Sequence, residues 1–166
     1  MDLQPPTLTL DTNILIEFWS RQQKLNVVEA LLQLAKQGKV DLAVTARIQD
    51  DIPRPPLADR INELPLLNIV QTGSVTRLGA WVLGRDMLGD QSFVDFVSNL
   101  EHRGTISGKK QPDWRDWDHL HAHYLLRRNT FLTWDNRILG FAEALKSQFG
   151  INIMTPEDYL ANSNLS

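Results

Sequence analysis

Short apolar runs alternate with helical patterns along most of the chain. Strands are predicted at short runs that contain apolar residues, often with threonine, at residues 7–11, 40–44, 67–70, 130–133 and 151–154. The segments between these runs repeat their apolar residues every three or four positions, which is the spacing of an amphipathic helix. Such an alternation predicts an α/β fold, a three-layer α/β/α sandwich with a central parallel sheet of about five strands.

The predicted helices differ in how clearly the sequence marks their ends. Residues 24–37 are the clearest, because their apolar residues follow helical spacing and Gly38 is a good stop. A second helix is predicted to run from Thr45, its N-cap, to Asp51. Residues 103–113 predict an exposed loop. Further helices are expected at residues 13–20, near 57–63, from Ser74 to about Met87, and at 91–101, 116–128 and 137–147.

Composition excludes several classes of protein. Cysteine is absent, which removes disulfides, thiolate nucleophiles and cysteine zinc sites. The net charge of −3 argues against a protein that coats nucleic acid passively, because that affinity comes from basic residues. No apolar run is long enough for a membrane span, and the N-terminus lacks a signal-peptide pattern, so a cytoplasmic location is expected. We expect one domain over residues 1–166, with an extended helix and loop segment at about 87–115.

Four aspartates occupy positions where a strand ends or a helix begins: Asp11, Asp51, Asp118 and Asp135. In open α/β sheets, chemistry collects outside the carboxyl ends of the strands. Carboxylates gathered there repel one another, and a hard divalent cation relieves that repulsion through oxygen ligands. The four positions therefore predict a metal-dependent enzyme that acts on phosphates.

Each aspartate also has a purely structural interpretation. Asp11 and Asp135 could cap the helices that follow them, since Asp is a favoured N-cap residue. Asp51 is adjacent to Asp50, and neighbours on a helix point about 100° apart, so the pair is not expected to serve one ion. Counting from Thr45 favours Asp51, but the choice between the two stays open.

Two further aspartates precede Asp118. We expect Asp116 to cap the helix and Asp113 to lie in the loop before it. Residues 101–115 hold four basic and two acidic side chains, a charge of +2, with one tryptophan inside the segment and another just after it. Basic groups interleaved with aromatic rings suit a single-stranded nucleic acid, although a polar loop anchored by two tryptophans explains the same residues.

Two stretches resemble the opening and closing motifs of the PIN domain, the nuclease fold of VapC-type toxins and related RNA-processing enzymes. They are LTLDTNILIEFW at the start and DHLHAHYLLRRNTFLTWDNRIL near the end. The shared pattern is a strand that ends in Asp-Thr-Asn, and a later Asp that opens a helix before a strand that ends in Thr-x-Asp. Here Asp135 follows Asp118 by 17 positions, the separation typical of that pattern.

The resemblance implies a metal-dependent endoribonuclease that uses Mg²⁺ or Mn²⁺. It implies that the three metal-binding acids are Asp11, Asp118 and Asp135. The implied middle acid is Asp51, and the implied supporting polar residues are Asn13 and Thr133. The implied partners are an RNA substrate, single-stranded or structured, an antitoxin protein if the chain is a toxin, and a second copy of the chain. The middle acid is usually Glu, so Asp51 is a departure from the pattern.

The histidines keep other interpretations open. His119, His121 and His123 stand where the family commonly has small residues, and a zinc site or a phosphate contact is conceivable. Their order does not match the HxHxDH of metallo-β-lactamases, and we expect solvated or partly buried helix histidines. A HAD-like phosphatase is disfavoured, because Asn13 stands where its second acid belongs. The alternative function is a catalytically weak or inactive PIN-like module that binds RNA or protein.

Overall fold

Five parallel strands form the central sheet of the protein. The computed structural model describes residues 4–20, 23–51, 64, 67–70, 72–73, 86–87, 90–107 and 112–163. The strand order is β3-β2-β1-β6-β7, with β1 at Thr7–Leu10, β2 at Asp41–Thr45, β3 at Leu67–Val70, β6 at Thr130–Leu132 and β7 at Asn152–Met154. Two short parallel strands, β4 (Thr72–Gly73) and β5 (Asp86–Met87), form a separate pair. The predicted α/β class with a parallel sheet is confirmed.

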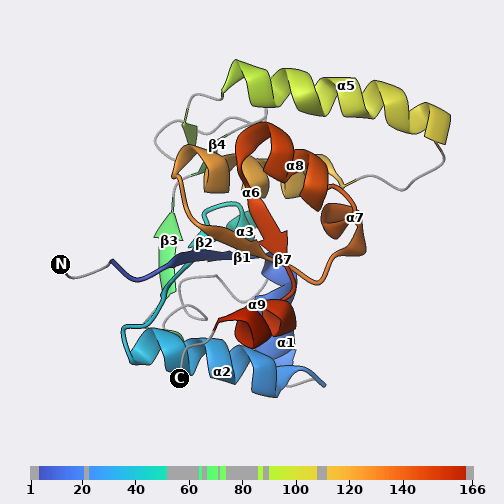
Figure 1. The fold of residues 1–166 in the computed structure, drawn as a ribbon. Helices are drawn as coiled ribbons and strands as arrows, with labels where there is room; N and C mark the ends of the chain where they lie inside the picture. Colours follow the sequence, from blue (N-terminus) through green and yellow to red (C-terminus); the bar gives the residue numbers. More distant parts are fainter. Residues whose placement is uncertain are drawn as a thin grey trace.

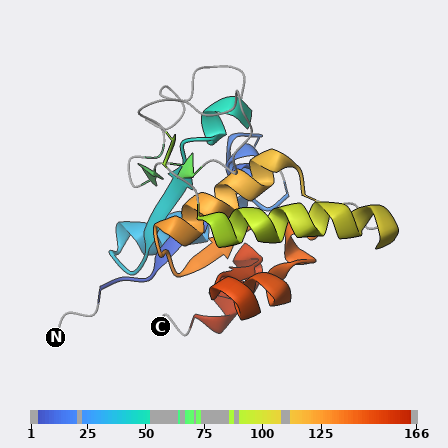
Figure 2. The ribbon, with the colours of Figure 1, turned by 90° about the horizontal axis from the view of Figure 1, so that it is seen from above.

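Helices cover both faces of this sheet (Figure 1). On one face lie α1 (Thr12–Ser20), α2 (Leu25–Lys36) and α9 (Pro156–Asn162), and on the other lie α5 (Gln91–Ser107), α6 (Trp114–Leu125) and α8 (Ala142–Phe149). Short helices α3 (Ile48–Asp51) and α7 (Asn136–Leu139) follow β2 and β6. One half of α5 extends past the other helices (Figure 2). Within the described residues, no helix is both long and apolar enough to cross a membrane.

Each face of the sheet has its own apolar core. One cluster joins β1 and β2 to α1 and α2, with Leu8, Ile14 and Leu31 fully buried. The other joins β6 to α5, α6 and α8 through Phe93, Trp117 and other aromatic and aliphatic residues. Because both faces are covered, consecutive residues of β1, β2 and β6 are buried whichever face they point to.

The register of the sheet brings the ends of three strands together. Leu8 of β1 lies beside Leu42 of β2 on one side and beside Thr130 of β6 on the other. Because all three strands run in parallel, their carboxyl ends meet at one edge. This edge receives the segments that begin at Asp11, Ala46 and Thr133.

Several predicted boundaries were wrong. Thr45 is the last residue of β2 and not an N-cap, and the helix after it begins only at Ile48. The loop predicted at 103–113 is partly helical, because α5 continues to Ser107. The helix predicted at 137–147 is interrupted between Leu139 and Ala142, and α9 was not anticipated.

Other predictions lie largely outside the described residues. The helix predicted near 57–63 is one of these. The helix predicted from Ser74 to about Met87 is another, since residues 74–85 are not described. The last two residues of that predicted helix form the strand β5 instead. The extent of the domain over residues 1–166, with a separate segment at about 87–115, stays a prediction.

Candidate functional site

Asp11 stands at the centre of the edge where the strands end. Its side chain is buried, and its carboxylate accepts three hydrogen bonds. These come from the backbone N–H of Thr12 at 2.7 Å, from Nδ2 of Asn13 at 2.8 Å and from Oγ1 of Thr133 at 2.5 Å. Asn13 and Thr133 therefore contact the acid that they were predicted to support, and the carboxylate is held in one orientation.

Burial nevertheless raises the pKa of Asp11 above its usual value. His119 and the donors from Thr133 and Thr12 lower this pKa, and the nearby charge of Asp135 raises it further, but burial is the largest effect. Burial therefore disfavours the ionised form of this carboxylate. A cation beside it would favour the ionised form.

Asp51 joins the site through two hydrogen bonds. Its Oδ2 accepts from Oγ1 of Thr12 at 2.8 Å and lies 2.8 Å from Nε2 of His119. Burial raises the pKa of Asp51, but the bond and charge of His119, with the bond from Thr12, outweigh burial, so that pKa is below its usual value. The side chain of Asp50 lies outside the described residues, so the preference for Asp51 rests on this network alone.

His119 is enclosed by the acids of the site. It is 2% exposed, and its Nδ1 contacts Oγ1 of Thr45. Burial alone would lower the pKa of His119, yet the hydrogen bond of Asp51 and the charges of Asp11, Asp51 and Asp116 raise it above its usual value. The acids around His119 therefore favour its protonated form.

The other two histidines of α6 are also buried in the interior, with other partners. His121 is fully buried, stacks on Phe93 with ring centroids 4.6 Å apart, and accepts from the backbone N–H of Asp90 at 2.8 Å. His123 contacts Oγ1 of Thr9 at 2.8 Å through its Nδ1. Burial lowers the pKa of His121 to about 4 and that of His123 to about 3. The expectation of solvated or partly buried histidines was wrong, because all three are buried.

Asp118 faces a different partner from the other acids. Its Oδ2 lies 2.8 Å from Nε of Arg47, and both side chains are 2% exposed. The guanidinium of Arg47 also lies 5.5 Å from the ring centroid of Trp114. A buried charge must be paired, and here each of the two side chains provides that partner for the other. The role of Asp118 as a metal ligand remains a prediction.

Sequence reasoning missed Arg47. Its one signal was its position two residues after the end of a buried strand, in TARIQDD. Arginine is mostly exposed in proteins, so that position alone could not mark it as a buried ion-pair partner.

Asp116 lies in the first turn of α6, within reach of the charges of Asp11 and Arg137. Its Oδ2 accepts from the backbone N–H of Asp113 at 2.8 Å. Asp113 is the N-cap and Asp116 completes a capping box, so the helix begins before the predicted position and Asp116 is not its cap. Burial raises the pKa of Asp116 to about 6, and the charges of Asp113 and Asp11 add to this effect.

Asp135 completes the network. It is the N-cap of α7, and its backbone N–H donates to Oγ1 of Thr133 at 2.9 Å, so a single hydroxyl links it to Asp11. The side chain of Arg137 binds Asp135 and lies 3.3 Å from Oδ2 of Asp116. Although burial raises the pKa of Asp135, the hydrogen bonds from Arg137 outweigh it and lower that pKa.

A continuous chain of contacts therefore joins four acids from four segments. We call these the edge acids: Asp11, Asp51, Asp116 and Asp135. Their donor set fits Mg²⁺ or Mn²⁺, because both ions prefer carboxylate oxygens and water. In the part of the chain that the structure describes, however, no three acidic or imidazole side chains are grouped closely enough to hold an ion. Several of the carboxylates turn instead toward the protein's own cationic side chains.

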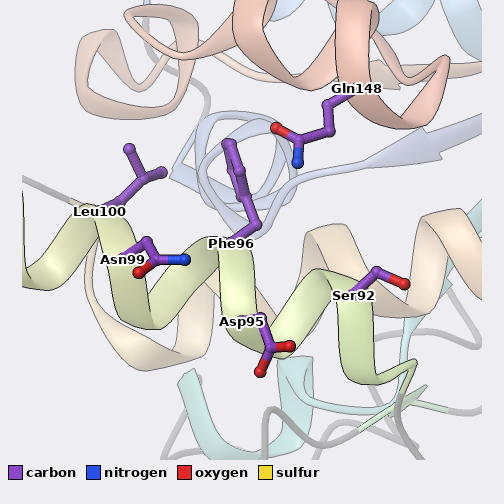
Figure 3. Close-up of a pocket in the computed structure, with 6 residues that line it drawn as sticks. All are labelled: Ser92, Asp95, Phe96, Asn99, Leu100 and Gln148. Carbon is purple, nitrogen blue, oxygen red and sulfur yellow. The ribbon is translucent and has the colours of Figure 1, made fainter.

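A cavity of about 390 Å³ lies between α5 and α8, away from this network (Figure 3). It is lined by Ser92, Asp95, Phe96, Asn99, Leu100 and Gln148. Phe96 and Gln148 point toward one another across it (Figure 3). The lining includes none of the edge acids, so the cavity is separate from the candidate site.

Comparison with known proteins supports the fold alone. No family model matches the chain, and no curated protein matches it. Among solved structures, the chain is similar to one in the crystal structure of VapBC2 from Rickettsia felis bound to a DNA fragment from their promoter. The TM-score is 0.51 with 12% sequence identity, and the match covers 90% of this chain and 98% of the other. The fold is therefore PIN-like.

Proposed function

We propose that this protein is a metal-dependent endoribonuclease. The observation that carries the proposal is the connected network of the edge acids, which come from four separate segments and meet where parallel strands end. Such an edge is the usual location of chemistry in an open α/β sheet. The similarity to a VapBC2 structure extends over most of both chains and supports the PIN-like fold, for which the sequence resemblance implies a nuclease.

The edge acids would hold the cation, with two polar residues to orient them. Asn13 and Thr133 donate to Asp11 and fix the direction of its carboxylate. Thr133 positions two acids at once, since its hydroxyl also accepts from the backbone N–H of Asp135.

The other two edge acids differ from the pattern expected from the sequence. Asp116 replaces Asp118 in this proposal, because Asp118 is directed at a buried arginine. Asp51 is a ligand with a shorter reach than glutamate, and Thr12 and His119 position it.

When bound, the divalent cation would supply Lewis-acid chemistry, the activation of water and the neutralisation of charge on the scissile phosphate. The chain's own contribution is to orient the acids and to keep Asp51 ionised. Three donors fix Asp11, and His119 favours the ionised form of Asp51. No protein nucleophile is required in this scheme.

The surroundings of the edge acids suit an RNA strand. Arg115 is a half-exposed cation that lies 4.0 Å from Asp51. Its guanidinium lies 5.3 Å from the ring centroid of Trp114, so a basic group and an aromatic ring stand together beside the acids. Side chains of this kind bind the phosphates and bases of single-stranded nucleic acid.

An antitoxin protein and a second copy of the chain are the partners that we propose. The supporting observation is that the similar structure is a VapBC2 complex. Light scattering on the purified chain, alone and after co-expression with the product of the adjacent reading frame, tests both partners. A monomer mass for the chain alone, with no co-purifying protein, would exclude both.

RNA cleavage tests the activity itself. We would incubate wild type and Asp11→Asn with single-stranded and structured RNAs, with EDTA, Mg²⁺ or Mn²⁺. We expect cleavage that requires the cation and falls by at least about a hundredfold in the variant, as when a group that orients or stabilises the reacting atoms is lost.

The matched control for this experiment is Glu143→Gln on α8. It neutralises an exposed acid that takes no part in the network of the edge acids, and it should cleave like wild type. Equal cleavage by wild type and Asp11→Asn would place the activity elsewhere and contradict the proposed site.

The alternative is a PIN-like module that binds RNA or protein without cutting. The pairing of Asp135 and Asp116 with Arg137 favours it, because the protein itself already supplies a counter-charge to those acids. Binding of RNA by wild type with no cleavage under any cation would support this alternative and end the nuclease proposal.

A further inference from the structure

Arg137 surrounds the carboxylate of Asp135 with hydrogen-bond donors. The backbone N–H of Arg137 donates to Oδ1 at 2.8 Å, and its Nε donates to Oδ1 at 3.0 Å and to Oδ2 at 2.9 Å. Its Nη2 also donates to Oδ2. A carboxylate offers about four acceptor positions, two on each oxygen. One residue therefore supplies as many hydrogen bonds as the carboxylate has acceptor positions.

The same guanidinium reaches a second edge acid. Nη2 of Arg137 lies 3.3 Å from Oδ2 of Asp116, an oxygen that also accepts from the backbone N–H of Asp113. Arg137 thus bridges the two acids with a positive charge. A divalent cation that bound both acids would need the same oxygens.

We propose that Arg137 is an internal counter-cation that keeps a divalent ion from Asp116 and Asp135 until its side chain turns away. The inference rests on the proposed function, because it concerns the same carboxylates.

The position of Arg137 allows such a displacement. Its side chain is 32% exposed, so the guanidinium has room to move into water. Arg47, which binds Asp118, is only 2% exposed, so its guanidinium is not open to water in the same way. The bond from the backbone N–H of Arg137 caps α7 and would remain.

Calorimetric titration of Mn²⁺ into the full chain tests this inference without any measure of activity. The proteins are wild type, Arg137→Ala, Arg137→Lys and Arg115→Ala, each checked for folding by circular dichroism. Arg115→Ala is the matched control, because it removes another partly exposed positive charge near an edge acid without removing a bidentate contact.

We expect Arg137→Ala to bind Mn²⁺ about tenfold more tightly than wild type, because a charge-assisted bidentate competitor has been removed. Arg137→Lys should fall between the two, since an ammonium cannot bind both oxygens as a fork. Arg115→Ala should change affinity by less than about threefold.

Equal gains in Arg137→Ala and Arg115→Ala would overturn the inference, as would an unchanged or weaker affinity in Arg137→Ala. In those cases wild type still binds Mn²⁺, and the proposed function stands. Failure of every protein to bind Mn²⁺ would overturn both the inference and the metal-dependent function.

Discussion

At the scale of single residues, the neighbours of each aspartate decide its role. Asp116 and Asp118 are two positions apart on α6, yet one lies toward the edge acids and the other faces a buried arginine. The sequence could not separate them, because both stand in the same run of acidic and aromatic residues. What separates them is Arg47, which lies on another segment.

The buried pair of Arg47 and Asp118 leads to a prediction about stability. Arg47→Met removes an ion-pair partner of the buried Asp118 carboxylate, which should lower the free energy of unfolding by about 3–5 kcal/mol. The double variant Arg47→Met with Asp118→Leu should recover most of that loss. Urea denaturation at pH about 7.5, where carboxylates are ionised, measures both. Arg115→Met, on the partly exposed Arg115, is the control.

Two results would contradict this account of Arg47 and Asp118. If Arg47→Met were as stable as Arg115→Met, the ion pair would not form in solution. If Asp118→Asn then lost Mn²⁺ binding while Asp116→Asn kept it, Asp118 would be the ligand and our assignment of Asp116 would be wrong.

At the scale of elements, α6 contributes polar side chains both to the network of the edge acids and to the buried core. The sequence marks its start only approximately, since three aspartates stand within six residues. Asp113 is the N-cap, because its side chain accepts from the backbone N–H of Arg115 at 2.8 Å and of Asp116 at 3.2 Å. The position of the helix start therefore changes which acid is a ligand candidate.

The capping box gives a prediction for this helix. Asp113→Ala removes the acceptor for two backbone N–H groups and should lower the free energy of unfolding by about 1 kcal/mol. It should also weaken Mn²⁺ binding, because Asp116 loses the fixed first turn that orients it. Thermal unfolding and calorimetry measure the two effects. Glu143→Ala, which changes an acid in the first turn of α8, should leave metal affinity unchanged; if Asp113→Ala also left it unchanged, the cap would have no influence on the site.

His121 predicts a pH dependence of stability. Its pKa falls from the ordinary 6.5 to about 4 in the folded protein, so the unfolded chain binds a proton first as the pH decreases. The stability that neutral His121 provides is complete above pH 6.5 and is lost between that pH and about 4. Acid therefore weakens the contact of α6 with the start of α5, where His121 accepts from Asp90.

A phenylalanine at this position isolates the effect. We compare the free energies of unfolding of wild type and His121→Phe. As the pH falls from about 7 to about 4.5, wild type should lose about 2 kcal/mol of this free energy relative to the variant. Guanidinium denaturation at several pH values measures that difference, in which the other titrating groups largely cancel. A difference that stayed constant with pH would show that His121 titrates normally in the folded protein.

At the scale of the whole molecule, the alternation of apolar runs and helical patterns was enough to predict the parallel sheet. The strands at 7–11, 67–70 and 130–133 were predicted within one residue of their observed ends. Elements whose ends depend on tertiary contacts were harder: α5 continues through residues that resemble a loop in composition, and α9 carries only a short apolar pattern.

The candidate site was predictable in part for the same reason. Acids at strand ends meet because parallel strands share an edge, so Asp11 and Asp135 could be placed without a structure. The partners of the other acids could not be placed, because packing between elements brings His119 to Asp51 and Arg47 to Asp118. Arg137 is only two residues from Asp135, but its sequence position does not show that it binds that carboxylate. Sequence spacing does not record which side of a helix faces which neighbour.

Anomalous X-ray scattering from crystals grown with Mn²⁺ tests the central claim most directly. We predict a peak within coordination distance, about 2.0–2.6 Å, of carboxylate oxygens of Asp11, Asp116 and Asp135. We also predict that Arg137 has turned away from Asp135. A map with no peak at the edge acids, or with a peak bound by Asp118, would contradict the proposed site.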